Sequence, residues 1–159
     1  KGKGHALLKG FKYAQDNNYT HILTLDSDLQ HDPNEVSLFL NLNYDIEFVL
    51  GFRKLSKPMP SHRILSNFLT SFIISTIKNR KIKDSQCGYR RYKTESIKTE
   101  VCNEYGYLFE TEILLNNINE KSHIEHVAIS TIYNDSKSSI NNIRDTIKFI
   151  KVIMRYIFA

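Results

Sequence analysis

Apolar residues along the 159-residue chain alternate between helical spacing and short continuous runs. Helical spacing covers about residues 6–17, 32–43, 61–78 and 141–158, and the stretch 105–112 leads into a helix that ends at about 119. Short apolar runs at 22–25, 46–52 and 124–133 predict strands. Helices that alternate with strands in this way favour a parallel sheet with helices on its faces. The pattern therefore predicts an α/β fold with a mostly parallel sheet.

The first apolar run, Ile22–Leu25, ends abruptly at Asp26-Ser27-Asp28. An unpaired carboxylate at the end of a buried strand is costly to desolvate, and two carboxylates so close repel each other. A divalent cation removes both costs, and an oxygen-rich site suits Mg²⁺ or Mn²⁺. Because ligands of open α/β sheets gather beyond the carboxyl ends of strands, we expect a metal here that grips a diphosphate. The alternative is a simple turn followed by a helix start at Asp32-Pro33.

Lys1-Gly2-Lys3-Gly4 stands immediately before the first helical pattern. A Gly/Lys segment at a helix N-terminus is able to hold a phosphate. The segment lacks the full P-loop spacing, so a flexible leader with solvated lysines is the alternative.

A second dense polar stretch runs from Asp84 to Tyr92. Its glycine, Gly88, allows a close approach of the backbone. Arg90 and Arg91 are neighbours, and neighbours in a strand point to opposite faces, so we expect one of them to be free for a phosphate. Further along, Glu110 and Glu112 either favour a helix start through the helix dipole, or one of them faces the site.

Two helical stretches combine apolar and basic residues. The stretch 61–78 is strongly apolar with basic residues at both ends, which fits either a buried core helix or a helix at a membrane surface. The stretch 141–158 has an apolar face and a largely basic one, which fits either interfacial membrane binding or packing with a solvated basic face. Between the last strand and this helix, 134–139 is either a solvated loop or a lid with a phosphate-directed lysine. We divide the chain into a domain part, 1–140, and a basic amphipathic helix, 141–159.

Composition and charge narrow the class of protein. The apolar share of 41% and charged share of 25% are those of a soluble globular domain, and the net charge of +5 favours anionic partners. No nucleic-acid motif is present, so we expect no nucleic-acid partner. Cys87 and Cys102 are the only cysteines, which argues against a disulfide framework and for a reducing compartment. The chain shows no signal peptide and no apolar run of membrane-spanning length, and it begins at Lys1 rather than Met, which suggests that an N-terminal part is missing.

In this order, the motifs resemble family 2 glycosyltransferases of the GT-A fold, a Rossmann-like α/β fold, and within them the dolichyl-phosphate mannose or glucose synthases. The most specific match is Asp26–Pro33, which resembles the family's DxDxQ metal motif. The other matches are Lys1–Gly4 with the Lys-Gly segment before a helix, Gly51–Arg53 with a Gly-x-Arg at a strand end, Asp84–Arg90 with an Asp-x-x-x-Gly-aromatic-Arg loop, and Tyr133–Ser138 with a Tyr-x₃-Lys-Ser stretch.

Two departures from the family pattern limit what the resemblance implies. The family's first half, which starts with a Pro-x-Tyr-Asn-Glu pattern and carries most contacts to the base and ribose, is absent. The fold is therefore expected to be incomplete at its N-terminus, and this polypeptide alone is expected to lack activity. Thr131 stands where the mannosyl members carry an arginine, so the sugar stays open.

The resemblance implies a metal-dependent, inverting transfer of a sugar from a nucleotide-diphosphate sugar to a polyprenyl (dolichyl-type) phosphate by a cytoplasmic enzyme peripheral on the membrane surface. It implies that Asp26, Asp28 and Arg90 are catalytic. The implied metal ligands for Mg²⁺ or Mn²⁺ are Asp26, Asp28 and Gln30, the donor is bound by Lys3, Gly4, Asp26, Ser27 and Asp28, and the acceptor phosphate by Arg53, Arg63, Arg90, Lys137 and Ser138.

A phosphate acceptor removes the need for a general base in the reaction. A sugar hydroxyl needs a general base, whereas a phosphate monoester has a second pKa of about 6 and is largely dianionic at neutral pH. The chain has no adjacent Glu-Asp pair, no Gln-x-x-Arg-Trp and no tryptophan, which favours the lipid-phosphate branch over processive polysaccharide synthases.

Two other classes of protein are alternatives to a glycosyltransferase. One is a haloacid-dehalogenase-type phosphatase, which has Thr or Val at the position where this chain has Gln30. The other is a non-catalytic module that binds anionic membranes or nucleic acid.

Overall fold

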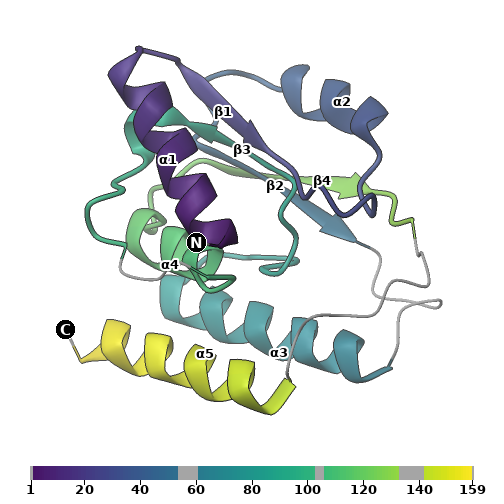
Figure 1. Cartoon of the computed structure of the whole chain (residues 1–159), viewed down its shortest axis with the longest axis vertical. Helices are drawn as coiled ribbons and strands as arrows, with labels where there is room; N and C mark the ends of the chain where they lie inside the picture. Colours follow the sequence, from purple (N-terminus) through teal and green to yellow (C-terminus); the bar gives the residue numbers. More distant parts are fainter. Residues whose placement is uncertain (1, 54–60, 103–105, 133–141, 159) are drawn as a thin grey trace.

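The computed structural model describes residues 2–53, 61–102, 106–132 and 142–158 (Figure 1). The sequence-predicted helices and strands are present, with two short 3₁₀ turns, η1 and η2. In chain order the elements are α1 (Lys3–Asp16), β1 (His21–Thr24), η1 (Pro33–Glu35), α2 (Val36–Leu40), β2 (Phe48–Arg53), α3 (Ser61–Lys78), β3 (Arg90–Lys93), η2 (Thr94–Ser96), α4 (Phe109–Asn117), β4 (Ile124–Ile129) and α5 (Asn142–Ile157).

The four strands form one sheet in the order β1-β3-β2-β4. The α/β class is confirmed, but the expected mostly parallel arrangement differs in this part of the chain: β2 and β4 are parallel, whereas β3 is antiparallel to both β1 and β2. The reason lies in the segment after α3, which runs back along that helix. Its residues bond successively earlier helix residues: the Ile82 amide donates to Ser75 Oγ, and the Ser85 amide donates to Ser71 Oγ. The chain thus reaches β3 at the end of the sheet where β2 stops, and β3 runs in the opposite direction.

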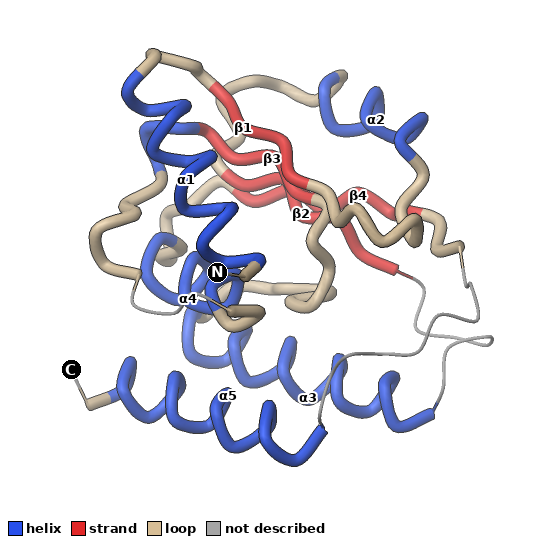
Figure 2. Tube along the Cα trace, viewed as in Figure 1, coloured by secondary structure: helices blue, strands red, loops and turns tan. Residues whose placement is uncertain are grey.

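Helices cover both faces of the sheet (Figure 2). One apolar cluster joins the sheet to α1, α3, α4 and α5, and a second joins it to α2. Strand β2 serves both, since Phe48 and Leu50 belong to the first cluster and Val49 to the second, as alternating side chains of a strand require. Phe149 of α5 lies in the first cluster, while the division at residue 140 stays a prediction.

The start of the helical stretch after Asp32 follows the expected capping chemistry. Asp32 Oδ1 accepts a hydrogen bond from the Asn34 amide at 2.9 Å, and Pro33 occupies the first turn. The helix is shorter than the sequence predicts, because α2 ends at Leu40. The sequence also predicts that Val36, Phe39 and Leu40 face inward on this helix. Phe39 is buried, but Leu40 is 43% exposed, since consecutive helix residues point about 100° apart.

Each of the apolar helices α3 and α5 buries one side and exposes another. In α3, Ile74 is buried, whereas Leu65, Phe68, Leu69 and Phe72 are at least 46% exposed. The core interpretation of this helix therefore holds for one side only. In α5, Phe149, Val152 and Ile153 are buried, while the exposed apolar residues are Ile147, Ile150, Met154 and Ile157. No helix in the described part of the chain is long and apolar enough to span a bilayer.

The expectation that Arg90 or Arg91 stays free for a phosphate is wrong, because both side chains are fully buried, one on each face of β3. Buried guanidinium groups need acceptors, and backbone carbonyls supply them here. Arg91 donates to the carbonyls of Phe39, in the last turn of α2, and of Leu42 and Asn43 just beyond it, at 2.6–2.9 Å. Arg90 donates to the carbonyls of Ser85, Cys87 and Glu110 and to the Tyr92 hydroxyl.

Replacement of Arg91 by methionine is expected to lower the free energy of unfolding by about 2–4 kcal/mol, because buried carbonyls lose their donors. Urea unfolding of the two proteins measures the difference. Lys93→Met, two residues along the same strand, is the control and is expected to behave as an ordinary surface substitution. Equal unfolding midpoints for the two variants would show that the Arg91 bonds contribute nothing.

Candidate functional site

Asp26, two residues beyond the end of β1, lies within a group of charges drawn from three elements. Lys3, in the first turn of α1, places its Nζ 2.5 Å from Asp26 Oδ1 and 2.6 Å from Glu110 Oε2 of α4. Burial opposes the charge of the Lys3 ammonium, but Glu110 and Asp26 outweigh it and raise its pKa. Lys3 therefore stays charged and holds both carboxylates together at the carboxyl end of β1.

Gly88 packs directly against the Asp26 carboxylate. A Cβ atom at this position would lie 2.7 Å from both carboxylate oxygens of Asp26, so the carboxylate rests directly on the glycine backbone. Thr24 Oγ1 donates to the Gly88 carbonyl at 3.0 Å and ties the loop to β1. The buried Arg90 side chain donates hydrogen bonds to the Cys87 and Ser85 carbonyls of the same loop, each at 2.7 Å. Arg90 thus supports the site from within the core.

Asp28 and Gln30 share a tight turn after Asp26. Asp28 Oδ1 accepts from the Gln30 amide at 3.1 Å, and Leu29 between them has a φ of 64°, the left-handed region that few non-glycine residues adopt. The Asp28 side chain is exposed. The turn thus presents one carboxylate to solvent beside the more enclosed Asp26.

His31 holds the backbone of Asp26 from the other side. Its ring is buried, and Nδ1 accepts from the Asp26 amide at 3.3 Å. Burial lowers the pKa of His31, which keeps the imidazole neutral and able to accept. The ring lies 5.3 Å from that of Tyr89. Sequence reasoning assigned no role to His31, since its position next to Gln30 does not show which way the ring turns.

The donors at this end of the sheet fit a metal ion that arrives with a phosphate ligand. Asp26 and Asp28 offer carboxylates, and Gln30 offers an amide oxygen. Within the described ranges, no group of three or more His, Cys, Asp and Glu side chains is placed to hold a metal. Mg²⁺ is usually held by one or two carboxylates together with substrate phosphates, so a pair of acids is the expected protein contribution.

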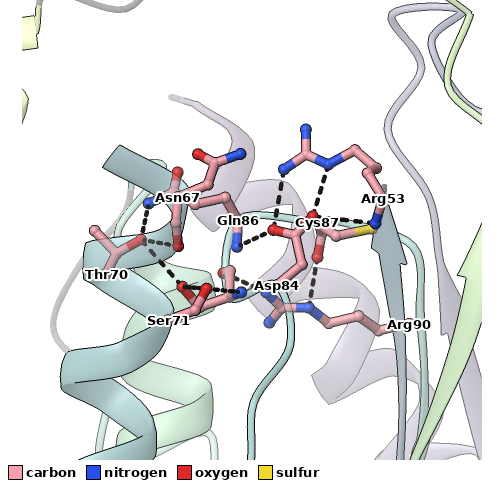
Figure 3. Close-up of polar contacts among 9 residues, drawn as sticks. Arg53, Asn67, Thr70, Ser71, Asp84, Gln86, Cys87 and Arg90 are labelled. Carbon is pink, nitrogen blue, oxygen red and sulfur yellow. Dashed lines mark hydrogen bonds and ion pairs between the residues drawn. The ribbon is translucent and has the colours of Figure 1, made fainter. Parts of the chain in front are cut away.

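A second polar cluster lies where β2 ends, between Arg53 and the polar side of α3 (Figure 3). Arg53 Nε and Nη2 donate to the two carboxylate oxygens of Asp84 at 2.8 and 3.1 Å. The Asp84 side chain is completely buried, and Arg53 is 15% exposed. Gln86 and Thr70 complete the cluster through a 3.3 Å hydrogen bond.

The structure brings some predicted site residues together and leaves others apart. Glu110 faces Lys3 and Asp26, whereas Glu112 pairs with Arg155 of α5. Arg53 contacts α3 through Asn67, whose amide oxygen, turned toward Arg53, accepts from Arg53 Nη2; the Asn67 amide nitrogen donates to the Arg63 carbonyl. Gly4 is buried in α1 and Ser27 is exposed. Lys137 and Ser138 lie outside the described residues.

The family model described as Glycosyl transferase family 2 matches residues 1–106. An uncharacterised protein of Methanocaldococcus jannaschii is 31% identical over 99% of this chain and 72% of its own length. The UDP-N-acetylglucosamine–dolichyl-phosphate N-acetylglucosaminyltransferase of Methanococcus voltae is 30% identical over 85% of this chain and 57% of its own length.

Among solved structures, glucosyl-3-phosphoglycerate synthase from Mycobacterium tuberculosis, in complex with Mn²⁺, UDP-glucose and glycerol 3-phosphate, superposes with a TM-score of 0.66 at 14% identity. The match covers 99% of this chain and 54% of that one. At this identity the likeness shows the fold. The chain thus spans about half the length of this solved structure and of the Methanococcus voltae enzyme.

The fold and the matched sequence define a glycosyltransferase with the GT-A-type α/β fold that the motifs implied. The chain belongs to glycosyl transferase family 2. This assignment replaces the phosphatase and the non-catalytic module that the sequence left as alternatives.

Proposed function

We propose that this polypeptide is part of an enzyme that transfers a sugar, with inversion, from a nucleotide-diphosphate sugar to a polyprenyl phosphate. The observation that carries the proposal is Asp26, held at the carboxyl end of β1 between Lys3 and the Gly88 backbone. The names of relatives support the acceptor: one is a dolichyl-phosphate N-acetylglucosaminyltransferase, and one is a polyprenol monophosphomannose synthase of Mycolicibacterium smegmatis, 25% identical over 91% of this chain.

The donor diphosphate is proposed to bind at the end of β1. Asp26, Asp28 and Gln30 would hold Mg²⁺ or Mn²⁺, and the structural relative crystallised with Mn²⁺ and UDP-glucose is consistent with a divalent ion. The bound ion supplies charge neutralisation for the leaving diphosphate. Lys3 adds a positive charge beside Asp26 that favours the same anion, and Gly4 and Ser27 border this position.

The acceptor phosphate is proposed to attack without a general base, because its dianion is already nucleophilic at neutral pH. One phosphate oxygen forms a bond to the anomeric carbon from the face opposite the diphosphate, whose bond to that carbon breaks. Arg53 and Arg63 are the described cations assigned to this phosphate, and Lys137 and Ser138 keep that role as predictions from the resemblance. Arg90 acts only as a support for the 84–88 loop.

A comparison of acceptors tests the proposal. The complete enzyme is incubated with Mn²⁺ and a sugar nucleotide, together with either a polyprenyl phosphate or the same polyprenol without its phosphate. Transfer is expected to the phosphate alone, with an inverted anomeric centre visible by NMR of the product. Equal transfer to the alcohol would contradict the absence of a base, and retention would contradict direct displacement.

We also propose that α3 and α5 rest on the cytoplasmic membrane surface. The two helices run side by side on the side of the molecule remote from the sheet (Figure 1). Their exposed apolar residues project from the protein, and Lys148, Lys151 and Arg155 of α5 are exposed with them. Exposed apolar side chains flanked by basic ones are typical of interfacial helices on anionic lipid.

The double substitution Phe68→Ser/Phe72→Ser is expected to weaken binding to phosphatidylglycerol vesicles at least about tenfold, because two exposed rings no longer enter the interface. Co-sedimentation with vesicles measures the partition. Tyr13→Ser/Tyr19→Ser is the matched control, since those two rings are equally exposed and also lie 6.2 Å apart, at the end of α1. Membrane binding through α3 is ruled out if both double variants partition alike.

A further inference from the structure

We propose that Asp84 is a positioning residue that fixes the Arg53 guanidinium for the phosphate of the acceptor. This inference rests on the proposed function and names how one end of its acceptor site is built. Asp84 would not touch substrate itself. It would act through Arg53, which stands at the end of β2 with its side chain 15% exposed.

The Arg53 and Asp84 side chains form a bidentate ion pair. Arg53 Nε lies 2.8 Å from Asp84 Oδ2, and Nη2 lies 3.1 Å from Oδ1. The Arg53 amide also donates to Oδ2 at 3.3 Å, so one carboxylate orients both the backbone and the side chain of the same residue. A carboxylate engaged through Nε and Nη2 leaves the Nη1 end of the guanidinium turned away from it (Figure 3).

Asp84 is itself held in place by the segment that follows it. Its Oδ1 accepts from the Gln86 amide at 3.0 Å. The next residue, Ser85, exchanges hydrogen bonds with Ser71 of α3, both through its amide at 2.9 Å and through its hydroxyl at 3.1 Å. The carboxylate therefore sits on a backbone that α3 anchors through Ser71, in addition to its own bonds with Arg53.

A third element completes the support. Asn67 of α3, with its amide oxygen turned toward the guanidinium, accepts from Arg53 Nη2 at 3.2 Å. The guanidinium is thus held by β2, by the loop after α3 and by α3 itself. A long arginine side chain loses rotamer entropy when it is immobilised, and a side chain fixed before the ligand arrives loses less of it on binding.

The competing explanation is that the pair only stabilises the fold. A purely structural ion pair would affect unfolding without a selective effect on either substrate. A positioning role predicts instead a selective loss of affinity for a phosphate monoester, with the sugar nucleotide unaffected, and it predicts that the effect disappears once Arg53 is gone.

The test uses the complete enzyme and isothermal titration with farnesyl phosphate, a short isoprenyl monophosphate, and separately with a sugar nucleotide plus Mn²⁺. Asp84→Asn is expected to weaken farnesyl phosphate about tenfold, because the amide accepts through only one oxygen and releases Arg53 Nε or Nη2. The affinity for the sugar nucleotide is expected to stay the same. Asp45→Asn, the same change at an exposed aspartate, is the matched control and is expected to change neither affinity.

A double-mutant cycle with Arg53→Gln separates the outcomes. In the Arg53→Gln background, Asp84→Asn is expected to have no further effect on farnesyl phosphate. The inference is overturned if Asp84→Asn leaves farnesyl phosphate binding unchanged, if it weakens both ligands equally, if its effect persists without Arg53, or if the native enzyme does not bind farnesyl phosphate.

A native enzyme that binds farnesyl phosphate with the expected coupling, yet transfers no sugar to a polyprenyl phosphate, would refute the proposed function and leave the role of Asp84 standing. Should Asp84→Asn fail to fold, Asp84→Glu, which keeps the charge but displaces it by one methylene, is expected to show the same selective loss.

Discussion

Replacement of Asp28 by alanine in the complete enzyme is expected to reduce metal-dependent sugar transfer at least about a hundredfold. Asp28 supplies one of the two carboxylates at the end of β1, and its side chain is exposed. Its one hydrogen bond to protein that the structure describes joins Oδ1 to the Gln30 amide, so the loss of activity should come with little loss of stability. Transfer rates at saturating Mn²⁺ and thermal unfolding of the same samples measure the two effects.

Asp16→Ala is the control for this prediction, because Asp16 is an exposed aspartate at the end of α1, away from the site. It is expected to transfer sugar at the native rate. An Asp28→Ala enzyme that keeps its full rate and its metal dependence would remove Asp28 from the metal site and leave Asp26 to hold the ion alone.

The second large effect is expected from the smallest change, Gly88→Ala. The added methyl would lie 2.7 Å from both oxygens of Asp26 and 2.8 Å from its Cγ, closer than Cβ atoms approach other atoms. Because the loop is tied to β1 through Thr24 and to the core through Arg90, the Asp26 carboxylate has to move rather than the backbone. We expect the rate of transfer to fall about a hundredfold as the carboxylate leaves Lys3 and the donor.

Gly106→Ala is the matched control for Gly88→Ala, since a Cβ there meets nothing within 4 Å. Kinetics at varied Mn²⁺ and varied sugar nucleotide distinguish the two variants. The Gly88 variant should need more Mn²⁺ for half-maximal rate, while the Gly106 variant should match the native enzyme. Native kinetics in both would mean that Asp26 does not have to occupy its place over Gly88.

The helices and strands follow from local pattern, and the path of the chain between them does not. The apolar pattern predicts the bounds of α1, α3 and β2 to within about three residues, because it depends on neighbours close in the sequence. The direction of β3 depends on the hydrogen bonds that draw residues 82–86 back along α3, and no periodicity encodes them.

Some features of the candidate site are evident from the sequence, and others depend on how the helices pack. The acidic turn after β1 is evident from the sequence, because charged residues end an apolar run. The pairing of Lys3 with Glu110 joins residues more than a hundred positions apart and emerges only from the packing of α1 and α4. Arg90 illustrates the reverse error: an arginine in a polar motif suggests a ligand contact, but its guanidinium satisfies carbonyls of the loop that carries Gly88.

The most direct measurement of the central claim follows a labelled sugar from a panel of uridine and guanosine diphosphate sugars into the lipid phase. The complete enzyme is supplied with a polyprenyl phosphate and Mn²⁺, with and without a chelator. We predict that label from at least one sugar nucleotide enters the organic solvent as a polyprenyl phosphosugar, and that the chelator prevents it. Label that appears only as free sugar in water, or that enters the lipid phase equally well with the chelator, would contradict the account.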